Sequence, residues 1–340
     1  MALPATTAAV IATTHKFDPD NLSGAASTET SAARYTLWTL AACIALGVVG
    51  WLMPKWLTFL ITMAAANGLV SLGIVVLMRG GVVPFGQGMV FAIGGYTAAL
   101  VANKWGFTDA LGGALLGGLM AALIAAPFAP LLSRYRGIFF AMLTLALSMV
   151  TYGLLMKLDM LGGSDGFNLA RPTLMGQKLP DDKVGYILYC LAVGVSLVMG
   201  LLSRIYFDST RGLITVAVRE NELRVEYLGG SVRHAMAINF VLAAFCGGLG
   251  GALAVMALGH IEPNFSFWTT SGEFVFVAIL AGWQSVLAVF VASTVLEVVR
   301  SFSSSYFPNT WQLALGVFLL LVIRFLPRGL GSLWVRGSTR

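Results

Sequence analysis

A few polar side chains interrupt the long apolar runs of this sequence and could recognise a polar solute. Asn67 and Gln87 are amides inside two of these runs, Thr144 is a hydroxyl inside another, and Glu273 stands at the start of a fourth. Amides donate and accept hydrogen bonds without the cost of a buried charge. Such groups favour either a path for a polar solute or ties between neighbouring helices worth about 1 kcal/mol each. Both interpretations stay open, and for Glu273 and Glu297 simple local pairing is a further alternative.

A charged stretch between Arg211 and His234 is the second candidate for function. Apolar residues recur at helical spacing over 215–228 and Gly229-Gly230 follows, so the pattern predicts one short surface helix with a glycine stop. Its charges four residues apart do not all attract each other, so they are not arranged to stabilise the helix itself. The stretch is either a solvated connector or a docking element for a cytoplasmic subunit. The candidate docking residues are Arg219, Glu220, Asn221, Glu222, Glu226 and Gly229.

Other kinds of chemistry find no support in the sequence. The chain has no Gly-x-x-x-x-Gly-Lys-Ser/Thr loop, so it cannot bind ATP by that device. His15, His234 and His260 have no metal-like spacing, and no Ser-His-Asp set is suggested. Each of the 3 cysteines lies in an apolar run, where a small hydrophobic role is expected rather than a disulfide. We therefore expect no catalytic residue, no metal site and no cofactor on this chain.

Composition places these residues in a membrane. Of the 340 residues, 58% are hydrophobic and 11% are charged, and the mean hydropathy is +0.84, whereas a soluble domain carries roughly 25% charged residues. So few charges cannot cover a water-facing surface, which excludes a soluble enzyme, a disulfide scaffold and a coiled coil. The net charge of +6 is scattered at the ends of apolar runs, which favours membrane orientation over nucleic-acid binding. The expected fold class is an all-α integral membrane protein.

Apolar runs of adequate or nearly adequate length for the roughly 20 residues of a membrane span recur along the chain. The run over 273–300 is too long for one span and is interrupted by Ala281-Gly282-Trp283-Gln284-Ser285, a small and polar segment. We expect it to split into a short segment over 273–283 and a second over 285–302, which makes ten transmembrane segments in all. The runs cover 36–53, 56–78, 85–103, 110–132, 138–156, 184–203, 236–257, 273–300 and 311–327.

Basic residues predict the orientation of these segments. The most basic connections are 204–235 and the C-terminus, and both are expected in the cytoplasm. With ten crossings the N-terminus lies there too, and the inside then carries 14 Lys and Arg residues against 7 outside. Residues 1–34 are expected to form a disordered cytoplasmic tail, and residues 35–335 a single transmembrane domain with its charged loop at 204–235.

Several stretches resemble one family of transport proteins. Residues 134–146 are similar to that family's Arg-Leu-Arg-Gly-x-Tyr-Phe-Ala-x-x-Thr-Leu-Ala stretch, and 162–166, Gly-Gly-Ser-Asp-Gly, to its Gly-Gly-x-x-Gly loop. Arg219-Glu220-Asn221-Glu222, followed by Leu228-Gly229, looks like its cytoplasmic Arg-Glu-Asn/Asp-Glu motif, and 86–100 and 271–273 add support. Over roughly residues 60–335 the chain resembles the membrane permease subunits of branched-chain amino acid ABC importers, specifically the LivM-type half.

The resemblance implies an importer of small organic solutes in a bacterial inner membrane. A homologous LivH-type permease subunit would complete the path, two cytoplasmic ATPase subunits would bind ATP and Mg, and a periplasmic substrate-binding protein would deliver the solute. Branched-chain or other amino acids are the expected solutes, with urea, short amides or aromatic acids as the alternative. An ion-coupled secondary transporter and a passive channel are the competing classes.

The resemblance also suggests which residues line the path and which couple it to ATP. A path near the midplane would be lined by Asn67, Gln87, Phe140, Thr144 and Glu273. The family usually has a Gly-Gly-x-Gly sequence after the Ser-Gly-Glu segment, where this chain has 281–285. Trp283 is therefore expected to shape selectivity. The resemblance assigns the docking residues of the 204–235 loop to the ATPase, with Arg219 and Glu220 facing it.

Overall fold

The computed structural model describes residues 45–47, 50–174, 180, 183–306, 308, 310–325 and 329–331. The expected tail over 1–34 lies outside the described residues, as does most of the first expected span. The α-helices are α2 (Lys55–Met78), α3 (Gln87–Trp105), α4 (Ala110–Ala125), α5 (Ala129–Leu132), α6 (Gly137–Lys157), α7 (Val184–Asp208), α8 (Thr210–Glu220), α9 (Glu222–Tyr227), α10 (Val232–Leu258), α11 (Trp268–Ala281), α12 (Val286–Tyr306) and α13 (Trp311–Phe325). Two short strands, β1 (Phe167–Asn168) and β2 (His260–Ile261), pair antiparallel.

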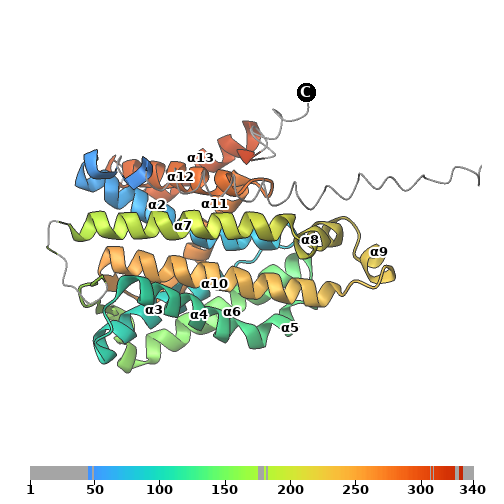
Figure 1. The fold of residues 1–340 in the computed structure, drawn as a ribbon, viewed down its shortest axis with the longest axis horizontal. Helices are drawn as coiled ribbons and strands as arrows, with labels where there is room; N and C mark the ends of the chain where they lie inside the picture. Colours follow the sequence, from blue (N-terminus) through green and yellow to red (C-terminus); the bar gives the residue numbers. More distant parts are fainter. Residues whose placement is uncertain are drawn as a thin grey trace, which may run out of the picture.

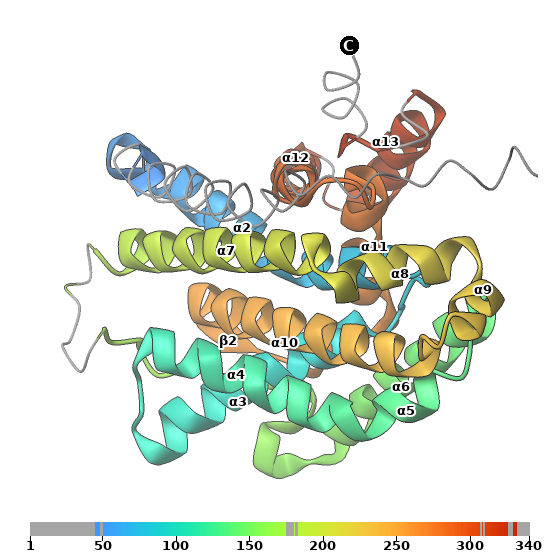
Figure 2. The same ribbon diagram turned by 45° about the vertical axis from the view of Figure 1, so that its right-hand side comes forward.

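The long helices form one bundle. Helices α7 and α10 run along its length, with α11, α12 and α13 on one side and α3, α4, α5 and α6 on the other, while α2 passes behind α7 (Figure 1). This division is also visible after the molecule is turned, and α8 and α9 lie together at one end in both views (Figure 2). In α2 and α10, 94% and 72% of the most apolar window is buried, against 22% in α6. Helices α2 and α10 therefore form the centre of the bundle.

Small residues bring α3, α4 and α10 into direct backbone contact. A methyl group at Gly94 of α3 would lie 2.1 Å from the carbonyl oxygen of Gly248 in α10. One at Gly117 of α4 would lie 2.7 Å from the carbonyl oxygen of Gly94. Neither distance leaves room for a side chain. Lipid supplies no hydrophobic drive between helices, so close approach of this kind is what provides their dispersion energy.

Most of the expected apolar segments are confirmed as helices. Within the described residues, 6 helices are long and apolar enough to cross a membrane, and 2 apolar helices are shorter, α11 and the 312–322 part of α13. The run over 110–132 is continuous from α4 into α5 through a short 3-10 turn, Ala126–Phe128. The chain is an all-α membrane protein, while ten crossings stay a prediction.

The expected break in the run over 273–300 is confirmed. Helix α11 ends at Ala281 and α12 begins at Val286. Gly282 has a φ of +76°, a left-handed conformation that residues with a side chain rarely adopt. The helix starts earlier than expected, at Trp268, because Phe267 is extended and ends the preceding irregular segment.

The expectation of a single helix over 215–228 is wrong. Two helices, α8 and α9, meet at Asn221, whose backbone is extended. The Asn221 side-chain oxygen accepts a hydrogen bond from the Arg224 backbone N–H at 3.0 Å. Asparagine is a strong helix N-cap, and here the cap prevails over the helical spacing of the apolar residues. The expected glycine stop is present at Gly229, where φ is +83°.

Candidate functional site

Two helices begin in the middle of the bundle rather than at its end. The Gly88 backbone N–H, in the first turn of α3, donates to the Ser271 hydroxyl in the first turn of α11 at 2.8 Å. Gln87 lies against the middle of α10, since a methyl group at Gly247 would be 2.9 Å from its Oε1. Ser148, in the middle of α6, donates to the 3-10 turn just before α11. The starts of α3 and α11 therefore meet at mid-depth.

This arrangement places irregular backbone inside the bundle. The segments 79–86 and 259–267, which lead to α3 and α11, contain no α-helix. Within a membrane such backbone must be buried in protein or line a polar cavity. Two helix N-termini also bring partial positive charge to one place. Transporters use discontinuous helices of this kind to hold solutes near the midplane.

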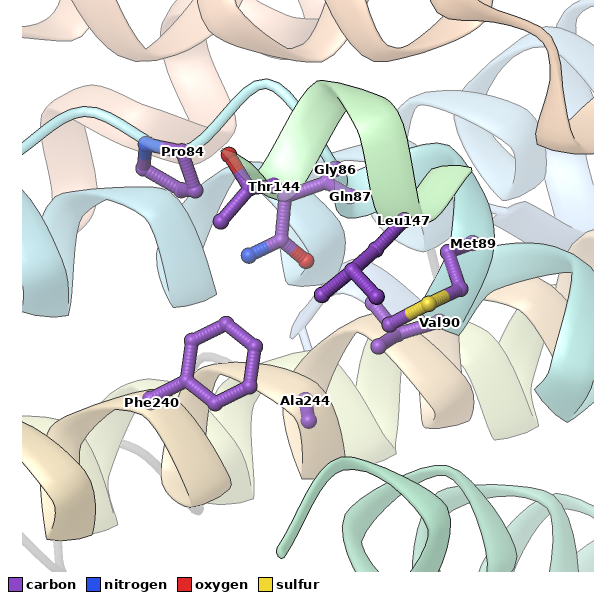
Figure 3. Close-up of a pocket in the computed structure, with 9 residues that line it drawn as sticks. All are labelled: Pro84, Gly86, Gln87, Met89, Val90, Thr144, Leu147, Phe240 and Ala244. Atoms are coloured by element: carbon purple, nitrogen blue, oxygen red, sulfur yellow. The ribbon is translucent and has the colours of Figure 1, made fainter. Parts of the chain in front are cut away.

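A small pocket lies beside the start of α3, and we call it the Gln87 pocket. Figure 3 shows the Gln87 and Thr144 side chains on one side of it and Phe240 on the other. Its volume of about 10 Å³ is at the lower limit for one water molecule. The pocket is lined by Pro84, Gly86, Gln87, Met89, Val90, Thr144, Leu147, Phe240 and Ala244.

Hydrogen bonding in the Gln87 pocket is nearly complete. The Thr144 hydroxyl accepts from the Phe85 backbone N–H and donates to the Phe140 carbonyl, both at 3.0 Å. The Phe140 ring packs edge-on against Phe240, with ring centroids 6.4 Å apart. Gln87 is only 2% exposed, and its Oε1 has no hydrogen-bond partner within the described part of the chain. A buried acceptor left without a donor costs about 1–3 kcal/mol.

A charged group joins α2, α11 and α12, and we call it the Glu297 cluster; it consists of Asn67, Glu273, Glu297 and Arg300. Asn67 Nδ2 donates to Glu297 Oε2 at 3.3 Å, and Arg300 Nη1 donates to Glu273 Oε2 at 3.1 Å. Asn67 stands in the middle of α2, so this cluster also lies at mid-depth. The Glu273 and Arg300 side chains are 23% and 38% exposed on the isolated chain.

The sequence identified only half of the Glu297 cluster. Asn67 and Glu273 are among the predicted path residues, local pairing is the alternative for both glutamates, and Arg300 is not among the predicted site residues. The signal that was present is the spacing of Glu297 and Arg300, which places both side chains on one face of α12. Charges at this depth cost several kcal/mol when they face lipid. The open side of the cluster must therefore meet protein or water.

We define the coupling segment as α8 and α9 with residues 228–230, and its side chains contact the bundle. Glu222 forms an ion pair with Arg136 at the start of α6. The guanidinium of Arg219 lies over the Trp283 ring, 4.4 Å from its centroid. The other docking candidates, Glu220, Asn221, Glu226 and Gly229, are exposed.

Three apolar side chains of the coupling segment, which were not among the docking candidates, are exposed on its surface. Tyr227 and Leu228 are 89% and 83% exposed, and Leu223 is 65% exposed. Just after α2, the Arg79 guanidinium lies over the Phe207 ring, 4.1 Å from its centroid. Burial lowers the pKa of the Arg79 guanidinium, and the Asp208 carboxylate opposes that shift. The apolar side chains together with the exposed charges form a surface suited to another protein.

Trp283 lies apart from the other path candidates. A second small pocket is lined by the four residues of the Glu297 cluster and their neighbours. Trp283 lines neither this pocket nor the Gln87 pocket. It contacts Arg219 of the coupling segment instead. At 1.5 Å per residue, the helix between Glu273 and Ala281 separates it from that cluster by about 12 Å. The structure thus brings Gln87, Phe140 and Thr144 together, brings Asn67 and Glu273 together, and leaves Trp283 with the coupling segment.

The described residues include two of the three cysteines. Within the described residues, no group of three or more His, Cys, Asp and Glu side chains could hold a metal ion. Cys190 and Cys246 are free thiols, and Cys43 lies outside the described residues.

Comparison of the sequence with known proteins finds similarity to membrane transport proteins. Residues 56–324 match the family described as branched-chain amino acid transport system / permease component. The chain is 27% identical over 281 residues to the high-affinity branched-chain amino acid transport system permease protein LivM of Escherichia coli (strain K12), covering 75% of this chain and 65% of that protein. It is 26% identical over 295 residues to the protein of the same name from Salmonella typhimurium (strain LT2), covering 79% and 68%. No solved structure matches it significantly.

The chain thus spans about two thirds of the length of the curated relatives it matches. The family match includes both mid-bundle helix starts, the Glu297 cluster and the coupling segment. The family match agrees with the long apolar helices of a multi-pass membrane protein. The chain belongs to the family of branched-chain amino acid ABC transporter permeases.

Proposed function

We propose that this chain is one permease half of an ABC importer for amino acids, and that it forms the solute path together with a homologous permease half. The observation that carries the proposal is the meeting of α3 and α11 at mid-depth, beside Gln87, Thr144 and Glu273. The irregular backbone there offers polar groups to a solute. A periplasmic binding protein would deliver that solute.

The Glu297 cluster supports a zwitterionic solute. Its carboxylates suit an ammonium group and its guanidinium suits a carboxylate. Urea, a neutral solute, needs neither charge. The partly exposed Glu273 and Arg300 would face the second permease half or the water of the path, because lipid cannot solvate them.

The ATPase subunits, with ATP and Mg, would dock on the coupling segment. Support comes from its exposed Tyr227 and Leu228 and from the exposed carboxylates of Glu220 on α8 and Glu226 on α9. This docking requires the coupling segment to be cytoplasmic, and with ten crossings the N-terminus and the C-terminus would lie on the same side. The turn at 79–81 and the break at 282–285 both contact Arg219, so they lie at the same end of the bundle as the coupling segment.

Reconstitution tests the proposal directly. The chain is placed in liposomes alone and together with its permease partner, ATPase subunits and binding protein, and uptake of leucine, urea and benzoate is measured. We expect leucine uptake only with all subunits and ATP. Uptake by the chain alone under a proton or sodium gradient would instead indicate a secondary transporter, and uptake without any gradient a channel.

A second experiment tests the docking. Glu220→Lys should lower ATPase binding to the purified permease, because a mismatched charge at an interface costs several kcal/mol. Glu222→Lys should add to this effect by also breaking the ion pair with Arg136. Asp159→Lys, an exposed charge beyond the far end of α6, is the matched control. Normal binding and hydrolysis in the Glu220 variant would contradict the docking surface.

A further inference from the structure

Helix α11 contacts the coupling segment at one end and the start of α3 at the other. Arg219 of α8 stacks over Trp283, which belongs to the break that ends α11. Ser271, in the first turn of α11, accepts a hydrogen bond from the Gly88 N–H of α3. A displacement of this short helix would therefore change contacts both at the coupling segment and at mid-depth.

The break interrupts the helical backbone between α11 and α12. Its residues 282–285 are not helical, and Gly282 has a positive φ. The end of α11 is held instead by neighbouring backbone, because the Leu330 N–H donates to the Leu280 carbonyl at 2.8 Å. A methyl group at Gly329 would lie 2.7 Å from the Gly282 nitrogen, so the two segments are in direct contact. The helical backbone is therefore not continuous from α11 into α12, and the bond between Arg300 and Glu273 is a side-chain contact that still joins the two helices.

Helix α8 also contacts parts of the bundle that have no break. Asn239 of α10 donates to the Thr215 hydroxyl of α8 at 3.1 Å, and the Tyr206 hydroxyl of α7 bonds the same asparagine. The Arg219 stem lies 3.3 Å from a methyl position at Gly81, in the turn after α2. Arg219 thus extends from a helix anchored to the continuous core across to the discontinuous α11.

We propose that Trp283 is a positioning residue for coupling, and that its stacking with Arg219 transmits movement of the coupling segment through α11 to the mid-bundle starts of α11 and α3. The inference rests on the proposed function and deepens it. It moves Trp283 from solute selection to transmission, in keeping with its absence from both polar pockets. The indole supplies a flat face for the guanidinium that a glycine at this position lacks.

The test measures leucine import and ATP hydrolysis together in the complete reconstituted complex. Trp283→Gly and Arg219→Ala should each lower the leucine imported per ATP about two- to tenfold, the range that loss of one cation–π contact corresponds to. Trp283→Phe and Arg219→Lys keep a ring and a charge and should retain more of this ratio. The double variant Arg219→Ala/Trp283→Gly should be no worse than the worse single variant, because both remove the same contact. The preference among leucine, urea and benzoate should not change.

Matched controls are Trp105→Gly, an exposed Trp at the far end of α3, and Arg324→Ala, an exposed Arg in the last turn of α13; both should retain the wild-type ratio. An unchanged ratio in Trp283→Gly and Arg219→Ala, additive losses in the double variant, or an altered solute preference with an unchanged ratio would overturn the inference. If Trp283→Gly fails to assemble, Arg219→Ala against Arg219→Lys decides, because Arg219 is a surface residue. A wild-type complex without ATP-driven uptake would overturn the proposed function itself. If wild-type uptake is normal, a contrary result in the variants overturns only the inference about the stacking of Arg219 on Trp283.

Discussion

The Gln87 pocket and the Glu297 cluster lie at similar depth in the bundle, but one is neutral and closed while the other is charged and partly open. Gln87 is 2% exposed, whereas the Glu273 and Arg300 side chains are 23% and 38% exposed. A single chain can enclose an amide and a hydroxyl at moderate cost, because neutral polar groups cost much less to bury than charged groups do. Two carboxylates and a guanidinium need a second polar surface. The comparison indicates that the α11–α12 face is where this chain depends on its partner or on the water of the path.

The largest effect on stability is expected from Arg300→Met. The change leaves Glu273 without the guanidinium that bonds it at 3.1 Å. We expect a loss of about 3 kcal/mol, the lower end for breaking a buried pair, because Arg300 is partly exposed. The thermal midpoint of the purified permease should fall accordingly. The double variant Glu273→Gln/Arg300→Met removes both charges and should recover the midpoint but not leucine uptake; recovered uptake would make the pair a structural tie only.

Thr144→Val should have the next largest effect, in the neutral pocket. The variant keeps the shape of the side chain but removes the acceptor of the Phe85 N–H. A buried donor without a partner costs about 1–3 kcal/mol. Thr144→Ser keeps the hydroxyl and serves as the control. Equal thermal midpoints for the Val and Ser variants would mean that the hydroxyl does not stabilise the start of α3.

Asn67→Leu should cost about 1 kcal/mol, the typical value of an interhelical polar contact in a membrane. Asn67 is 8% exposed and donates to Glu297 at 3.3 Å. We expect a small fall in the thermal midpoint and a clear fall in leucine uptake, because Glu297 loses a group that orients it. A stability loss as large as that of Arg300→Met would instead place Asn67 among the main structural ties.

The smallest effect on stability is expected from Gln87→Leu. Within the described structure Gln87 Oε1 has no hydrogen-bond donor, so an apolar side chain of similar size should be neutral or slightly stabilising. Leucine uptake should fall if the amide meets the solute. Thermal denaturation and uptake are measured on the same preparation. Lower stability with normal uptake would show that Gln87 is only a packing residue.

The sequence predicts the helices of this fold well because lipid imposes simple rules. Length and apolarity predict α2, α6, α7 and α10 to within a few residues at most ends, since a helix is the way for a single apolar segment to satisfy its backbone in lipid. The break at 282–285 is also predicted, because small and polar residues interrupt an over-long run.

Depth and side-chain partners could not be predicted in the same way. The run over 85–103 looks like any other span, and only the contacts of Gly88 with Ser271 and of Gln87 with α10 show that α3 begins at mid-depth. The stacking of Arg219 on Trp283 joins residues 64 positions apart in the sequence, which no local pattern reports. Asn221 was available as a signal, since asparagine caps helices, but the helical spacing around it suggested continuity.

Thiol accessibility beside the Glu297 cluster tests the central claim most directly, namely that the mid-bundle helix starts line a water-filled solute path. Gly272, next to Glu273, has open space where a side chain would stand, as does Gly194, which shares a helix face with the exposed Val198 and Leu202 of α7. Gly272→Cys and Gly194→Cys are made in a chain without its three native cysteines, and the assembled complex is treated with a small charged thiol reagent. The account predicts that the thiol of Gly272→Cys reacts, and that adding leucine, ATP and binding protein changes the rate of this reaction. The thiol of Gly194→Cys, which faces lipid, should stay unmodified. An unreactive thiol at 272, or equal reaction at both positions, would contradict it.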